Sequence, residues 1–257
     1  CPYEAKTALH VSAHNQPIND IQFAPYQSNL LASCDGDGAV KLWQTPGTDP
    51  DSACSAWDKA EPALVIAGDG CAKEILQWHT TANHMLTAAG GDVISVYDVQ
   101  GSAQKDVCTI KAGGTAENDG GDIHSLSWSY DGSLLACTDS KLGVCIYDIR
   151  VNSGNQRVMT MIPGGGKMGA QTKHKPSRVV WLGGLFDNKG LATVYLDKQR
   201  GSQLSVTDMR SGAKTLSTQS LNSSATSTPR VFYDADSDSI YLAAKNSVSV
   251  CFINGNW

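Results

Sequence analysis

Four residues near the start of the chain have the types and the order needed for a hydrogen-bonded series of polar side chains. They are His14, Ser33, Asp37 and Trp43. The Trp43 indole can donate to the Ser33 hydroxyl, which in turn can meet the His14 imidazole. Asp37, in a tight turn, can fix that imidazole. Because each member satisfies a polar group that is costly to bury alone, we expect a structural tetrad that stabilises the fold and does no chemistry.

Two stretches imitate ion-binding loops, and each fails at required positions. DADSDS (234–239) resembles the start of a calcium loop, but Ser239 and Lys245 stand where Gly and Glu are needed. PGGGKMG (163–169) resembles a phosphate loop, but it lacks the first Gly and the Ser or Thr that should follow Lys167. We therefore predict a solvated hairpin turn at the first stretch and a loop without a cofactor at the second.

Metal binding and catalysis are not expected either. His10 with His14, and His79 with His84, have spacings found in metal sites, but neither pair has a third ligand nearby. The chain has no GxSxG motif, and no Ser/His/Asp arrangement stands out among its many serines. We predict no catalytic residue, no metal ligand and no cofactor, and therefore a protein that is not an enzyme.

The tetrad residues belong to a unit that recurs: a strand, a short polar turn and a second strand. The five copies are NLLASCDGDGAVKLWQ, HMLTAAGGDVISVYDV, SLLACTDSKLGVCIYDI, GLATVYLDKQRGSQLSVTDM and SIYLAAKNSVSVCFIN. Their second strands end at Trp43, Tyr97, Tyr147, Thr207 and Phe252. These ends lie 45 to 60 residues apart, near or somewhat above the ~40–45 residues of a WD-type repeat.

Another strand precedes each unit, and a fourth strand follows four of them, as in INDIQF before the first copy and ALVIA after it. This pattern predicts an all-β fold, a WD40-type β-propeller of four-stranded antiparallel blades. We expect a single propeller region over 1–257, with 1–11 as the leading strand of a preceding blade. The blade repeats are expected at roughly 12–66, 67–111, 118–162, 174–220 and 228–257.

Composition favours a soluble globular protein of the cytosol. Apolar residues make up 41% of the 257, and no stretch approaches the ~18 consecutive apolar residues of a membrane span. The first ten residues lack the pattern of a signal peptide. The eight cysteines form no CxxC pair, and several lie in apolar strands, so we expect them to be reduced. No membrane insertion is expected.

Two later stretches carry a family resemblance. HKPSRVVWLGG (174–184) with the hairpin that follows it, and TPRVFYDADSDSIYLAAKNSVSV (228–250), resemble the fifth and sixth blades of coronins. The segment from Phe232 to Leu242 is the most specific part, because general WD repeats do not normally show it. The resemblance covers almost the whole chain in order. It implies a propeller of seven blades, of which we count about five here.

The resemblance implies a non-enzymatic scaffold of the actin cytoskeleton that binds actin filaments, their regulators, or both. It also implies a cytoplasmic, cytoskeleton-associated location and contacts with other proteins through the propeller faces. The insert between 44 and 62 is more divergent than in short coronins, which leaves an alternative open. The chain could belong to the tandem-propeller branch and act as a WD-repeat adaptor in membrane trafficking or in ubiquitin-ligase-linked complexes.

Basic residues are concentrated in one part of the chain. Residues 150–214 hold eleven Lys and Arg against three Asp, a balance of +8, so the remaining residues carry −13 within a net charge of −5. Such a region can attract an acidic partner, or it can be an ordinary solvated face. The candidate partner-binding residues are Lys173, Lys175, Arg178, Lys198, Arg200, Arg210 and Lys214. Nucleic acid is not expected, because the chain is acidic overall and the region has few aromatic residues for base stacking.

Overall fold

The computed structural model describes most of the chain, and every regular element in the described residues is a β-strand. The described ranges are 13–45, 61–68, 70–100, 105–112, 121–151, 156–162, 176–184, 186–197, 201–210, 212–224, 228–244 and 247–252. In them no helix is long and apolar enough to cross a membrane.

The strands form five antiparallel sheets, each built from consecutive strands. The first sheet contains β1 (Ile18–Ala24), β2 (Gln27–Asp35), β3 (Val40–Gln44) and β4 (Leu64–Ile66). The second contains β5 (Ile75–Trp78), β6 (Met85–Gly90), β7 (Val93–Asp98) and β8 (Lys105–Lys111). The third contains β9 (Ile123–Trp128), β10 (Leu135–Asp139), β11 (Gly143–Tyr147) and β12 (Arg157–Met161).

The last two sheets continue the series. The fourth contains β13 (Arg178–Leu182), β14 (Gly190–Leu196), β15 (Gly201–Asp208) and β16 (Lys214–Ser224). The fifth has three strands among the described residues, β17 (Arg230–Asp234), β18 (Ser239–Ala244) and β19 (Ser247–Phe252). Short hairpin turns make this arrangement possible, and one example is the β2–β3 turn, where Gly38 has a φ of 83° that favours glycine.

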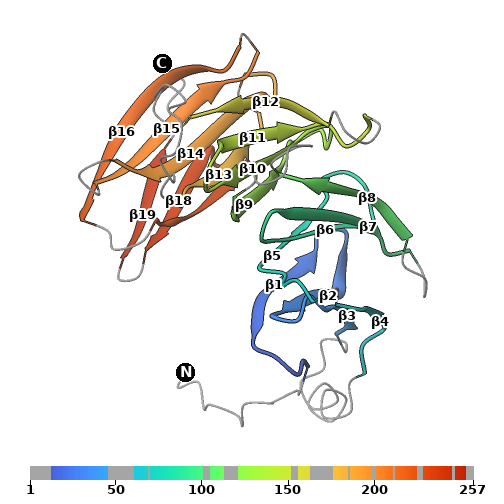
Figure 1. The fold of residues 1–257 in the computed structure, drawn as a ribbon. Helices are drawn as coiled ribbons and strands as arrows, with labels where there is room; N and C mark the ends of the chain where they lie inside the picture. Colours follow the sequence, from blue (N-terminus) through green and yellow to red (C-terminus); the bar gives the residue numbers. More distant parts are fainter. Residues whose placement is uncertain are drawn as a thin grey trace.

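The sheets follow one another along an arc, as Figure 1 shows from blue to red. The first strand of each sheet is innermost and packs against the first strand of the next, β1 on β5, β5 on β9, β9 on β13 and β13 on β17. We call these five the inner strands. Such stacking of four-stranded sheets around a centre is the architecture of a propeller.

Among the described residues, the core is divided into four apolar clusters, each lying between two successive sheets. One cluster joins Leu42 of the first sheet to Leu76 of the second, and another joins Ile94 of the second to Leu135 of the third. The remaining two lie between the third and fourth sheets and between the fourth and fifth. Because each sheet buries its faces only against its neighbours, the blades stabilise one another in sequence.

The predicted all-β WD40-type propeller with about five blades is confirmed. The stretch at 234–239 closes the β17–β18 hairpin, where Asp234 accepts bonds from the Asp236 N–H and the Ser237 hydroxyl. The described residues contain no group of three or more side chains that could hold a metal ion. The expected leading strand at 1–11 lies outside the described residues, as does the stretch at 163–169.

Candidate functional site

Three of the four expected tetrad residues form one hydrogen-bonded series. Trp43 Nε1 donates to Ser33 Oγ at 2.8 Å, and Ser33 Oγ lies 2.6 Å from His14 Nε2. His14 Nδ1 then lies 2.8 Å from Asp35 Oδ2. The acidic member is therefore Asp35, and the expectation of Asp37 is wrong.

The positions of the two aspartates relative to the end of β2 explain why Asp35, and not Asp37, contacts His14. Asp35 is the last residue of β2 and its side chain is 4% exposed on the same face as His14, whereas Asp37 lies exposed in the turn. The other carboxylate oxygen of Asp35 accepts the N–H groups of Asp37 and Ala39, each at 3.0 Å. Burial alone would raise the pKa of Asp35, but these bonds and the one to His14 outweigh it and lower the pKa.

In the third sheet an aspartate also accepts backbone N–H groups of the turn that follows the second strand, but no histidine takes part. Asp139, the last residue of β10, accepts the N–H groups of Lys141 and Leu142 with one oxygen and that of Gly121 with the other. A Cβ on Gly121 would lie 2.2 Å from Ser140 Oγ, so only glycine permits this close approach. The carboxylate at the end of the second strand therefore fixes the turn in both sheets.

The structure describes three of the seven candidate basic residues, Arg178, Arg210 and Lys214, and it does not bring all three together. Lys173, Lys175, Lys198 and Arg200 lie outside the described residues. Arg178 begins β13 and pairs with Val194, whereas Arg210 follows β15 at the end where Gly190 pairs with Asp208. Arg178 and the pair Arg210 and Lys214 therefore belong to opposite ends of the fourth sheet.

Arg210 is held by its own sheet. Its guanidinium donates to both carboxylate oxygens of Asp208, with the shortest contact at 2.8 Å, and to Asp187 at 2.9 Å. It also lies 5.5 Å from the centre of the Phe186 ring. Because these contacts use its donors, Arg210 is poorly placed to bind a partner, while Lys214 is exposed.

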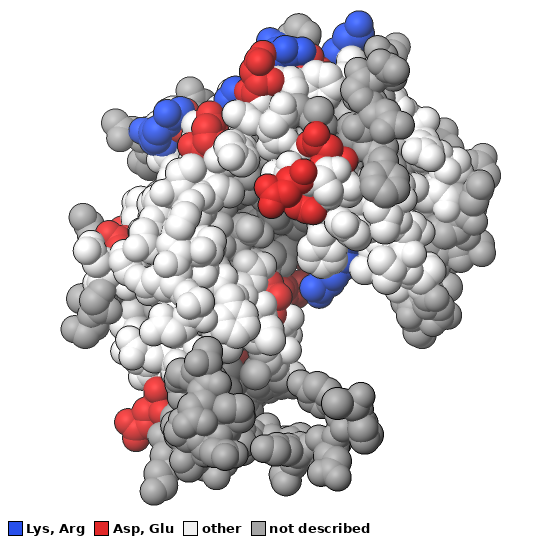
Figure 2. Space-filling model, turned by 180° about the vertical axis from the view of Figure 1, so that it is seen from behind, with Lys and Arg blue, Asp and Glu red and all other residues white. Residues whose placement is uncertain are grey.

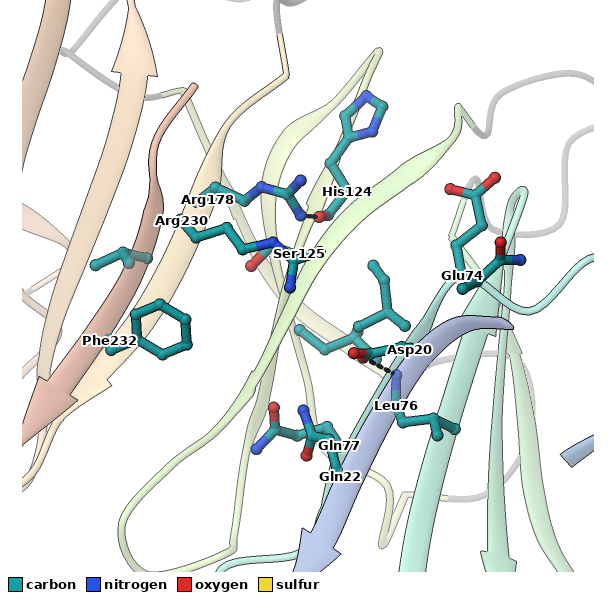
Figure 3. A pocket seen from close by; sticks show the side chains of 14 residues that line it. Asp20, Gln22, Glu74, Leu76, Gln77, His124, Ser125, Arg178, Arg230 and Phe232 are labelled. Atoms are coloured by element: carbon teal, nitrogen blue, oxygen red, sulfur yellow. Dashed lines mark hydrogen bonds between the residues drawn. The ribbon is translucent and has the colours of Figure 1, made fainter. Parts of the chain in front are cut away.

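A cavity of about 350 Å³ lies at the centre of the arc and is lined by residues from all five inner strands. Figure 2 shows acidic and basic side chains close together beside a hollow in the middle of the molecule. Figure 3 shows the lining in detail, with Arg178 and Arg230 on one side and Asp20 and Glu74 on the other. The wall of the cavity is therefore divided by charge.

The two arginines hold equivalent places in neighbouring inner strands, since Arg178 is the first residue of β13 and Arg230 the first of β17. Arg178 donates from Nη1 to the backbone carbonyl of His124. Burial, followed by repulsion from Arg230, lowers the pKa of Arg178. Burial and the nearby Arg178 also lower the pKa of His124.

The polar groups on the other inner strands tie successive blades together. Asp20 Oδ2 accepts the N–H of Leu76 at 2.9 Å, which joins the first sheet to the second. Ser125 Oγ accepts the N–H of Val179 at 3.2 Å, which joins the third sheet to the fourth. Asp20 and Ser125 therefore already make hydrogen bonds that join neighbouring blades.

Sequence reasoning placed Arg178 in a surface patch and missed Arg230, Asp20 and Glu74. A signal was present, because both arginines follow a proline closely, in KPSR (175–178) and PR (229–230), at the start of a strand that precedes a hairpin. What the sequence did not show was that β13 and β17 are adjacent inner strands whose first residues share one cavity.

The comparisons with known proteins agree with this architecture. The family described as WD domain, G-beta repeat matches residues 6–44. Coronin-7 of Homo sapiens is 26% identical over 94% of this chain and 23% of its own length. Coronin-2A of Homo sapiens is 25% identical over 93% of this chain and 42% of its own length.

Among solved structures, the WD40 domain of Toxoplasma gondii coronin superposes with a TM-score of 0.76 at 19% identity, over 95% of this chain and 58% of that one. That likeness supports the fold, while the sequence likeness to two coronins extends over more than nine tenths of the chain. The chain spans about a quarter of Coronin-7 and about two fifths of Coronin-2A. Together these findings show a WD-repeat propeller that is similar in sequence to coronins over more than nine tenths of the chain.

Proposed function

We propose that the protein is a non-enzymatic scaffold of the actin cytoskeleton that binds actin filaments or their regulators in the cytoplasm. The observation that carries the proposal is the similarity to coronins over more than nine tenths of the chain. A propeller suits this task, because the loops at the two ends of its strands present separate surfaces to protein partners.

The candidate contact consists of basic residues that are close in the sequence to strand ends of the fourth sheet. Arg178, Leu196 and Gly201 flank the segments that carry Lys173, Lys175, Lys198 and Arg200, and β13 to β15 place these three flanking residues at the same end. A group of cations at one end of a sheet would attract an acidic filament, and the attraction would weaken as salt screens it. Lys214 belongs to the opposite end and serves as a reference.

Cosedimentation with actin filaments at increasing salt tests this proposal. The double variant Lys173→Glu with Lys175→Glu is expected to pellet severalfold less than the parent at low salt, with an unchanged thermal midpoint. The matched control is Lys111→Glu with Lys214→Glu, which makes the same change in net charge at exposed positions elsewhere, and it is expected to pellet like the parent. Equal pelleting of all three proteins would show that the basic region is only a solvated face, and no pelleting of the parent would refute actin binding by this chain.

The second candidate function is that of a WD-repeat adaptor in membrane trafficking or in ubiquitin-ligase-linked complexes. The observation in its favour is the similarity to Coronin-7, a longer relative that matches 94% of this chain and of which the match covers 23%. Affinity capture from cells distinguishes the two functions. Recovery of actin and its regulators supports the scaffold, whereas recovery of trafficking or ubiquitin-ligase components without actin supports the adaptor.

A further inference from the structure

The central cavity combines a size and a wall chemistry that suit a ligand. Its volume of about 350 Å³ falls within the ~300–1,000 Å³ that is common for binding sites. Every inner strand contributes to the wall, so the cavity exists only because five segments far apart in the sequence converge. Its charge is divided between an arginine side and an acidic side, as Figure 3 shows.

Arg178 has unused hydrogen-bonding capacity inside this cavity. A guanidinium has five N–H donors, and one of them is used by the carbonyl of His124. Its Nε is buried and has no hydrogen-bond partner among the described residues. A buried donor without an acceptor is costly, so this nitrogen would gain from an oxygen atom supplied by a ligand.

Arg230 adds a second cation directly beside the first, as Figure 3 shows. Within the described part of the chain, the Arg230 side chain makes no hydrogen bond or ion pair. Two guanidinium groups that lie side by side repel one another, because both carry a positive charge. An oxyanion between them would remove the repulsion and accept the free N–H groups.

The acidic residues of the wall do not fill this role. The two oxygens of Asp20 accept the backbone N–H groups of Ile21 and Leu76, at 3.0 and 2.9 Å. Glu74 lies across the cavity from the arginines in Figure 3. Neither carboxylate forms an ion pair with Arg178 or Arg230, so the anion must come from outside these residues.

We propose that the cavity binds an acidic peptide segment of a partner protein, with one carboxylate seated between the guanidinium groups of Arg178 and Arg230. A carboxylate is planar and matches the forked donors of arginine. A phosphate dianion fits less well, because Asp20 and Glu74 line the same cavity and repel the additional charge. The amides of Gln22 and Gln77, which Figure 3 places together in the lining, can bond to the peptide backbone.

The test is a titration of the isotope-labelled protein, followed by NMR, with the acetylated and amidated peptide Gly-Gly-Glu-Gly-Gly. Its counterpart with Gln in place of Glu has the same shape without the charge and is expected to bind at least about tenfold more weakly, the loss typical of a charge-assisted hydrogen bond. The variant Arg230→Gln is expected to show a similar loss with the Glu peptide. The matched control Arg150→Gln removes the same charge at a side chain that is 68% exposed and outside the cavity, and it is expected to bind like the parent.

A second measurement separates binding from folding. Without peptide, Arg230→Gln is expected to raise the thermal midpoint, because it removes the repulsion with Arg178. A lower midpoint would show that Arg230 is structural, and equal binding of the Glu and Gln peptides would show that no carboxylate is recognised. Either result overturns the proposal, as does inorganic phosphate that binds more tightly than the Glu peptide. No actin is present in these measurements, so their outcome is independent of the proposed scaffold function.

Discussion

The carboxylate of Asp35 makes three hydrogen bonds that link a turn to a buried series of side chains. One oxygen accepts two backbone N–H groups of the β2–β3 turn, and the other meets His14. From His14 the series runs through Ser33 to Trp43, which is 4% exposed. At the residue scale, the polar members stabilise the blade because each one satisfies the next inside a region that water does not reach.

Asp35→Asn and Asp37→Asn differ by two positions and are expected to differ in stability. Asn at Asp35 weakens the acceptor for His14 and for the turn, at an expected cost of about 1–3 kcal/mol in the free energy of unfolding. Asn at the exposed Asp37 is expected to cost less than about 0.5 kcal/mol.

Trp43→Phe keeps an aromatic ring but removes the indole donor, and a cost similar to that of Asp35→Asn is expected.

Urea denaturation monitored by fluorescence or circular dichroism measures these differences. A similar loss for the two aspartate variants would contradict the assignment of Asp35 as the acidic member. An unchanged midpoint for Trp43→Phe would show that the indole donor contributes nothing.

At the scale of elements, the seam between the second and third sheets depends on a neutral histidine. His79 follows β5, is 6% exposed and packs on Trp128 with ring centres 4.4 Å apart. Its Nδ1 accepts the N–H groups of Ala82 and Thr81, so the proton lies on Nε2, which donates to the Gly132 carbonyl at 3.0 Å. A second proton on Nδ1 would break both backbone bonds.

Stability is therefore expected to fall as the pH drops below about 6.5. Burial lowers the pKa of His79 from its ordinary value of 6.5, so the unfolded chain binds the proton more readily than the folded one. The contribution is fully present above the unfolded pKa and is lost as the pH falls through the window beneath it. His124, whose pKa is also lowered, contributes in the same direction.

Urea midpoints at pH 5.5 and pH 7.5 measure the effect. The difference between the two midpoints is expected to be smaller in His79→Gln than in the parent, because glutamine does not titrate. His79→Gln with the full pH dependence of the parent would assign that dependence to other groups.

For the whole molecule, the stacking of blades leaves apolar side chains exposed on the first and last sheets. In the fifth sheet, Phe232, Tyr241 and Val250 stand opposite one another across three strands and are 53%, 37% and 44% exposed. In the first sheet, Ile21 and Phe23 are similarly exposed. Contiguous apolar surface of this kind binds hydrophobic molecules, whereas single exposed apolar residues do not need an explanation.

Replacement of Phe232 and Val250 by serine is expected to lower the binding of the dye 1-anilinonaphthalene-8-sulfonate, with little change in the thermal midpoint. Val158→Ser removes a side chain of β12, in the third sheet, that is 58% exposed, and it is expected to leave dye fluorescence unchanged. An equal decrease in both proteins would indicate that the dye does not distinguish the sheet face from a lone residue.

The sequence by itself determined the blades. Strand alternation, short polar turns and the recurrence of one unit are local signals, and they predicted the five sheets, the all-β propeller and three of the four tetrad residues. These signals suffice because side-chain period and turn chemistry act over a few residues. They could not separate Asp35 from Asp37, because the two aspartates are only two positions apart. Which of them faces His14 depends on where β2 ends and the turn begins.

Only the tertiary structure decided what the inner strands build together. Arg178 and Arg230 lie 52 positions apart, and each looks like an ordinary basic residue before a strand. Sequence distance carries no information on which strands become innermost neighbours, since that follows from how whole sheets bury their apolar faces against one another. The same packing placed Arg178 in the central cavity and Arg210 at the other end of its sheet, within reach of Asp208.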